Sequence, residues 1–334
     1  MRATAAYKAV EASQLQHGFP REARMRRVSI GILLILAAAL HAGEVRPVTE
    51  NAKWVIHVDC QKILGSELGP FIRQVAQKPE PAAGLAQIEV VFGIKLLSDI
   101  HQITIFGEEA SEEKTVLAVQ GHFDLKKLTA LIEKSPQYTT SNYSGRVIHT
   151  WHDGEKNKNP YACLAAENLL LVGNTEAMIC RVLDTLDGKA PAAVFGADVA
   201  TADSLAYFAV RDLQSLQGAD PKAAILQKVT ELRAHADAKE HQFGVSVEAK
   251  AVNEAAAKNV KSVLDGLRAM AALNAQENET LAAIADKVSV QGDGLVVRVS
   301  LSVAADTATA WLDAQLKQAG NGAKPNVLAT PAGQ

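Results

Sequence analysis

The sequence has little of what marks a specialised class of protein. Of its 334 residues only 3 are cysteine and 5% are aromatic, and 22 glycines and 11 prolines are too few for a fibrous or low-complexity chain. Lys and Arg total 34 against 37 Asp and Glu, so the charge balance does not indicate binding to nucleic acid. A single strongly apolar run excludes a protein with several membrane-spanning helices. The composition is that of a globular chain with room for about two domains.

The apolar run, 28–40, has the flanks of a secretory signal. It follows Arg26 and Arg27 and leads into His41, Ala42 and Gly43, which gives the basic, apolar and small-residue order of such segments. We therefore expect residues 1–42 to be a signal segment, with Met25 as an alternative start, and the protein to be periplasmic or extracellular. Their removal takes away six basic and two acidic residues and changes the net charge from −3 to −7. Membrane contact is expected only if the apolar segment stays uncleaved as an anchor.

The three cysteines, Cys60, Cys163 and Cys180, do not form a disulfide framework or a metal motif. An odd and low count in an exported chain favours buried thiols, and a bridge between Cys163 and Cys180 is the alternative. No two cysteines have the spacing of a zinc site, and the phosphate-binding and dinucleotide-binding glycine loops are absent. We expect no metal, no cofactor and no nucleic-acid partner.

Strand-like and helical runs alternate twice along the chain. The pattern predicts an α+β protein with two related halves, 43–190 and 203–318, each an antiparallel sheet with helices packed on one face. In the second half, a strand at 207–212 and a helix at 223–236 correspond to the first strand and helix of the first half. Residues 319–334 have the composition of a disordered tail.

Four segments of the first half resemble a group of uncharacterised exported bacterial proteins. They are WVIHVD at 54–59, the stretch 92–108, VQGHFDLKKL at 119–128 and LLLVGNTEAMICRVLDTLDG at 169–188. The resemblance implies an extracytoplasmic location and this order of elements. It implies no activity, so no catalytic residue is carried over.

Strand parity suggests one candidate ligand-binding surface. If Ile56 and Val58 face the core, His57 and Asp59 lie on the other face of their strand. His149 and Trp151 alternate in the same way on a later strand, so all four would share one sheet face if the two strands were neighbours. An aromatic ring beside titratable groups is a plausible recognition surface. The alternative is that this face only packs against the other half or meets water.

No catalytic motif is present: the sequence has neither a GxSxG elbow nor an HExxH segment. We therefore expect an exported non-enzymatic binding or structural protein, with an envelope or extracellular protein as its partner. The alternative is a hydrolase or ligand-binding enzyme with a site between the two halves, with His57, His149 or His152 as acid or base.

Overall fold

The computed structural model describes residues 48–154, 157–193, 195, 204–213, 226–274 and 284–320. The predicted signal segment and nearly all of the predicted tail lie outside the described residues. Within the described part, no helix combines the length and the apolar composition needed to cross a membrane.

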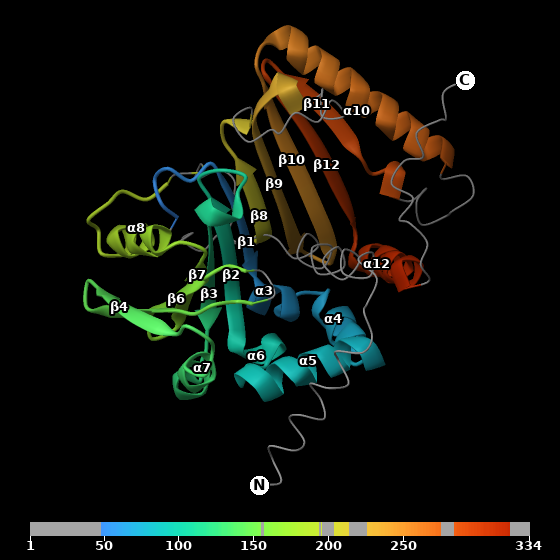
Figure 1. Cartoon of the computed structure of the whole chain (residues 1–334). Helices are drawn as coiled ribbons and strands as arrows, with labels where there is room; N and C mark the ends of the chain where they lie inside the picture. The colour runs from blue at the N-terminus through green and yellow to red at the C-terminus, as the bar shows by residue number, and fades with distance from the viewer. Residues whose placement is uncertain are drawn as a thin grey trace. The chain divides into compact units, whose positions relative to one another are not determined.

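The first half consists of seven strands with helices between them (Figure 1). Its elements are β1 (Trp54–Asp59), α3 (Cys60–Gly65), α4 (Gly69–Ala76), α5 (Pro79–Phe92), α6 (Leu96–Asp99), β2 (Ile100–Gly107), the short 3₁₀ helix η1 (Glu112–Lys114), β3 (Thr115–Gly121), α7 (Leu125–Ile132), β4 (Thr139–Tyr143), β5 (Arg146–Thr150), β6 (Tyr161–Ala166), β7 (Leu169–Gly173) and α8 (Glu176–Leu186).

The second half repeats part of this order. Its described elements are β8 (Ser204–Val210), the 3₁₀ helix η3 (Leu226–Lys228), β9 (Val229–Lys239), β10 (Gln242–Ala251), α10 (Glu254–Asn274), β11 (Ser289–Asp293), β12 (Val296–Ala304) and α12 (Ala305–Gly320).

The α+β class predicted from the sequence is confirmed, and the sheet is antiparallel throughout. The strands of both halves form one twelve-stranded sheet in the order β11-β12-β10-β9-β8-β1-β2-β3-β7-β6-β5-β4. The junction is the pairing of β1 with β8, in which His57 lies opposite Tyr207. Two separate sheets were expected, but both edges of β1 are paired, to β2 and to β8, so the sheet continues across the junction.

Read outwards from this junction, the two halves have the same strand order. The first half runs β1-β2-β3-β7-β6 and the second runs β8-β9-β10-β12-β11, and β5 with β4 extends the first half beyond this common part. In each half a helix follows the third strand, and another follows the hairpin. The interpretation of this order as an internal duplication stays a prediction.

Helices cover opposite faces of the sheet in the two halves. A Cβ atom at Gly173 of β7 would lie 3.2 Å from Cδ1 of Ile179 in α8, and the register runs from Gly173 through Val116 and Phe106 to Val55. We call the side that carries Val55 and His57 the α8 face. The other side carries Trp54, and we call it the α10 face. The register from Trp54 runs through Val210 to Leu232, Ala249 and Val297, and these last three residues pack in the same cluster as α10.

The core of the first half lies between the α8 face and α8. Met178, Ile179, Val182 and Leu183 of α8 are fully buried, and so are Phe106, Val116, Leu171 and Cys163 of the sheet. The side chain of Thr175 caps the first turn of α8 by accepting a hydrogen bond from the amide of Met178, and Asp124 caps α7 in the same way. The helix at 125–132 therefore begins directly after its capping residue.

The core of the second half lies on the α10 face. Ala256, Ala257 and Val260 of α10 pack against Ala249 and Val297 of the sheet. Small side chains at these positions allow the helix to approach the strands closely.

The helix predicted at 223–236 is wrong, because residues from Val229 onward form β9. The spacing of Val229, Leu232 and Ala236 suits one face of a helix, but Leu232, Ala234 and Ala236 also alternate with Arg233 and His235. Pairing of β9 with β8 on one edge and with β10 on the other decides for the strand. A second difference is β4, a short polar strand that the sequence pattern did not predict.

Candidate functional site

The structure separates the four residues predicted to share one sheet face. His57 and Asp59 are on β1, whereas His149 is on β5 and Trp151 follows it. Strands β2, β3, β7 and β6 lie between β1 and β5, so the backbones are about 24 Å apart at the usual strand spacing. The register also places His149 beside Ala162 and Val172, on the α10 face and not on the face of His57. These four residues therefore do not form one site.

The predicted core face of β1, which carries Ile56 and Val58, is confirmed only in part. Val58 is buried and Ile56 is half-buried, but Val55, His57 and Asp59 on the other face are buried as well. Strand β1 is paired along both edges at the centre of the sheet, and buried side chains lie on both of its faces.

His57 sits in a buried polar row across the junction. Its Nδ1 lies 2.7 Å from Oγ1 of Thr104 on β2, and its ring centroid lies 5.7 Å from that of Tyr207 on β8. The other ring nitrogen, Nε2, is buried and has no hydrogen-bond partner among the described residues. Burial lowers the pKa of His57 to about 4, and the nearby Asp59 carboxylate only partly opposes this effect. The imidazole is therefore neutral at pH 7.

Asp59 has a structural role at the end of β1. One carboxylate oxygen accepts a hydrogen bond from the amide of Lys62, which caps α3, and the other accepts one from Gln102 at 3.0 Å. Burial, with a smaller effect of Asp59, raises the pKa of the adjacent Cys60 thiol to about 11. Cys60 is therefore a thiol and not a reactive thiolate at neutral pH.

His149 and His152 have separate partners. Nδ1 of His149 lies 2.9 Å from the Tyr138 hydroxyl, and Nδ1 of His152 lies 3.0 Å from Oδ1 of Asn159. Neither contact involves His57, whose partner is Thr104, so the structure does not bring these three histidines together. In the described residues, no group of three His, Cys, Asp or Glu side chains could hold a metal ion. All three cysteines are free, so the alternative bridge between Cys163 and Cys180 is not formed in this structure.

The most polar surface of the sheet was not anticipated from the sequence. On the α8 face, the junction row continues through His235, Ser246, Ser300 and Ser289. The adjacent row carries Arg233, Glu248 and Arg298 on neighbouring strands, with alternating charge. We call the side chains of these two rows on β9–β12, together with Glu231 and Lys250 of the next row, the polar face. Polar and apolar residues alternate in the sequence of β9, which is typical of a strand with one polar face. The prediction of a helix at 223–236 assigned these residues to a helix instead.

Ion pairs connect the strands along the polar face. Nε of Arg298 donates to Glu248 at 2.6 Å, and Nζ of Lys250 donates to Glu231 at 2.7 Å. The Arg233 guanidinium donates to the same Glu231 at 3.2 Å. These side chains are 27–51% exposed, so the pairs contribute little to stability but fix the positions of the charges.

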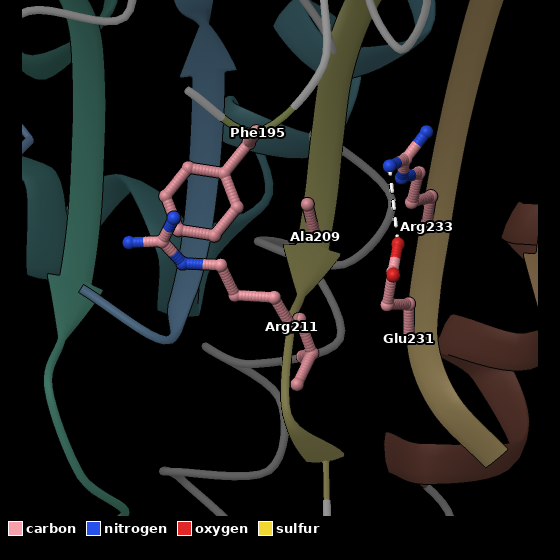
Figure 2. Close-up of a pocket in the computed structure, with 6 residues that line it drawn as sticks. Phe195, Ala209, Arg211, Glu231 and Arg233 are labelled. Carbon is pink, nitrogen blue, oxygen red and sulfur yellow. Dashed lines mark hydrogen bonds and ion pairs between the residues drawn. The ribbon is translucent and has the colours of Figure 1, made fainter. Parts of the chain in front are cut away.

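Two adjacent pockets open beside these charges. One, of about 230 Å³, is lined by Phe195, Ala209, Val210, Arg211, Glu231 and Arg233. The other, of about 250 Å³, shares Glu231 and Arg233 and adds Glu248, Lys250 and Val296. Figure 2 shows Ala209 between the Arg211–Phe195 pair on one side and the Arg233–Glu231 pair on the other. The small Ala209 side chain leaves the space between the two arginines.

Arg211 is held in place without a carboxylate partner among the described residues. Its Nε donates to the carbonyl oxygen of Ala52 at 2.7 Å, and it also donates to the carbonyl oxygen of Glu50. The guanidinium carbon lies 5.0 Å from the centroid of the Phe195 ring, which is a cation–π contact.

Comparison with known proteins gives little beyond this geometry. No family model matches the chain, and no curated protein is similar to it in sequence. Among solved structures, crystal form III of TP0453 aligns with a TM-score of 0.44 and 8% identity, over 80% of this chain and 96% of that one. Crystal form I of TP0453 aligns with a TM-score of 0.38 and 7% identity, over 80% and 95% of the two chains.

Proposed function

We propose that this protein is an exported, non-enzymatic binding or structural protein and that the polar face is its binding surface. The supporting observation is the asymmetry of the second-half sheet. Its α10 face packs against α10, while its α8 face presents fixed, partly exposed charges and two pockets. Partly exposed charged rows with defined partners are suited to recognising a polar ligand or protein.

Export is a separate part of the proposal and rests on the pattern of residues 1–42. Mass spectrometry of the protein after expression in a bacterial host tests it. A mature chain that begins near Gly43 is the expected result. A chain that retains the apolar run contradicts cleavage and favours the anchored alternative.

A thermal-shift screen with a matched pair of variants tests the binding surface. The unfolding temperature is measured against metals and envelope metabolites for the wild type, for Ser246→Arg and for Ser262→Arg. Ser246 lies at the centre of the polar face, whereas Ser262 is an exposed residue of α10. A ligand that binds the native state raises the unfolding temperature.

We expect compounds that stabilise the wild type to stabilise Ser262→Arg but not Ser246→Arg. A compound that stabilises all three equally places the site elsewhere, and chemical turnover of a compound supports the enzyme alternative. A flat response across the panel contradicts small-molecule binding and leaves a protein partner or a structural role.

A further inference from the structure

The pocket between Arg211 and Arg233 has more positive than negative charge. Arg211 and Arg233 line this pocket, and Lys250 lines the adjacent one. Glu231 is the carboxylate that pairs with two of them, at 3.2 Å from Arg233 and 2.7 Å from Lys250. The three cations therefore have one carboxylate, Glu231, to balance their charge.

The neighbouring acidic groups do not remove this excess. Glu248 is paired with Arg298, and Asp212, which follows Arg211 in the chain, lies 3.2 Å from Nζ of Lys53. Among the described residues, Arg211 contacts only carbonyl oxygens and the Phe195 ring. Counting Glu231 against Arg211, Arg233 and Lys250 gives the two adjacent pockets, among the described residues, a net charge of about +2, in a chain whose net charge is −3.

We propose that this pocket binds a small dianion, a dicarboxylate or a phosphate group, between Arg211 and Arg233. The inference rests on the proposed function, because it places a specific ligand class on one end of the polar face. Guanidinium groups present planar N–H donors that match the oxygens of carboxylate and phosphate, and two of them balance two negative charges.

The arginine side chains that line the pocket are already held in place, so they would lose little conformational entropy when an anion binds. The Arg211 side chain is already fixed by two carbonyl oxygens and by the Phe195 ring, and Arg233 is oriented by Glu231. Ala209 provides the floor between them without filling the space (Figure 2). A preorganised pair of cations binds an anion more tightly than two mobile side chains do.

The size of the pocket limits the ligand. Its volume of about 230 Å³ lies below the usual range for drug-sized ligands, which starts at about 300 Å³. Phe195 and Val210 give it an apolar side, so a compact anion with a short carbon skeleton fits the lining as well as a phosphate group does.

Isothermal titration of the full chain with sodium phosphate and, separately, with sodium succinate tests the proposal, with sodium chloride at matched ionic strength as the reference. Saturable binding of either anion above the chloride reference is the expected result. Binding of succinate alone identifies a dicarboxylate site, and binding of phosphate alone identifies a phosphate site. Saturable binding of neither anion overturns the proposal.

Three single substitutions make the test specific. Arg233→Gln is expected to weaken binding at least about tenfold, because it removes one charged donor. Glu231→Gln is expected to strengthen binding several-fold, because it removes the carboxylate that competes with the ligand. Arg268→Gln removes the same charge from α10, where Arg268 lies near Asp265, and is expected to leave binding unchanged.

Equal binding by wild type and Arg233→Gln overturns the proposal, as does weaker binding by Glu231→Gln. Circular dichroism of each variant shows whether it is folded, and Arg233→Lys, which retains the charge, is expected to retain part of the affinity if Arg233→Gln does not fold. The proposed function is tested independently at Ser246, so a failed anion titration does not decide that broader proposal.

Discussion

In the first half of the sheet the face under α8 is the buried one, whereas in the second half α10 covers the opposite face. The strand order outward from the junction is the same in both halves, so topology alone does not determine which face receives a helix. On the α8 face, the first half presents Leu171, Ala118 and Phe106, and the second half presents Arg233, Ser246 and Arg298. The side chains therefore determine which face of the sheet is covered by a helix, and the two halves of one continuous sheet can be covered on opposite faces.

The junction is where this change occurs, and His57 lies in it. Its row passes from Thr104 through His57 and Tyr207, all buried, to His235, whose side chain is 26% exposed. A polar row that starts under the apolar core of one half therefore reaches the surface in the other.

Removing a core aromatic ring from the α8 face should have the largest effect. Phe106→Ala is expected to lower the free energy of unfolding by about 3–5 kcal/mol, because its ring is fully buried. Phe208→Ala is the matched control, since Phe208 is half-buried on the α10 face of β8, and it is expected to cost about 1–2 kcal/mol. Urea unfolding at pH 7 measures both. Equal losses would contradict the assignment of the buried face.

Acid should destabilise the protein through His57. Its pKa is about 4 in the folded state against 6.5 in the unfolded chain, so the unfolded chain binds the proton more readily. The contribution of neutral His57 is fully present above pH 6.5 and is lost as the pH falls to 4, by about 3 kcal/mol in total. His57→Gln should remove this part of the pH dependence.

The test compares urea unfolding of the wild type and His57→Gln across this pH range, so that the carboxyl groups contribute equally to both. His235→Gln, at the exposed end of the same row, is the control. If wild type and His57→Gln lose stability in parallel, His57 does not titrate as its burial requires.

The packing of α10 can be tested with two valines on one helix. Val260 is buried against Ala249 and Val297, whereas Val263 is 48% exposed. Val260→Ala is expected to lower the free energy of unfolding by about 2 kcal/mol, and Val263→Ala by no more than about 0.5 kcal/mol. Thermal or urea unfolding of the two variants measures the difference. A larger effect at Val263 would mean that α10 faces the sheet differently.

The smallest expected difference is between two ion pairs. Arg181 of α8 binds both carboxylate oxygens of the buried Glu108, whereas Arg298 and Glu248 form a pair on the polar face. Double-mutant cycles with alanine should give a coupling energy of about 1–2 kcal/mol for the first pair and about 0.2–1 kcal/mol for the second. High salt should weaken mainly the second pair. A stronger coupling on the polar face would show that its charges are less hydrated than their exposure indicates.

Several elements could be read from the sequence because their signals are local. The cap of Asp124 and the apolar stripe of 125–132 predict α7, and the glycine turn at 292–294 predicts the β11–β12 hairpin, in which Gly294 has a φ of 55°. The predicted ligand-binding surface depended on a long-range contact, because it required β1 and β5 to be neighbouring strands. Four strands separate them.

The alternation of polar and apolar residues along a strand predicts its buried face only when the opposite face is polar. In β9 the polar side chains Arg233, His235 and Asp237 alternate with alanines and Leu232. The sequence therefore predicts the exposed face of this segment once the segment is known to be a strand. In β1 buried side chains lie on both faces, Val55 and His57 on one and Val58 on the other, so the alternation of residues does not mark a single core face. Which edge of a strand finds which partner depends on residues far away in the chain.

The sequence by itself determined the α+β class, most of the strands and helices, and the repeated order of elements, because capping residues, turn residues and apolar periodicity act over a few residues. Only the tertiary structure decided that both halves share one sheet, that α8 and α10 cover opposite faces, and that Arg211 and Arg233 line one pocket. These facts depend on pairing between segments more than a hundred residues apart, such as β1 with β8, and on the space that side chains leave once the strands are aligned.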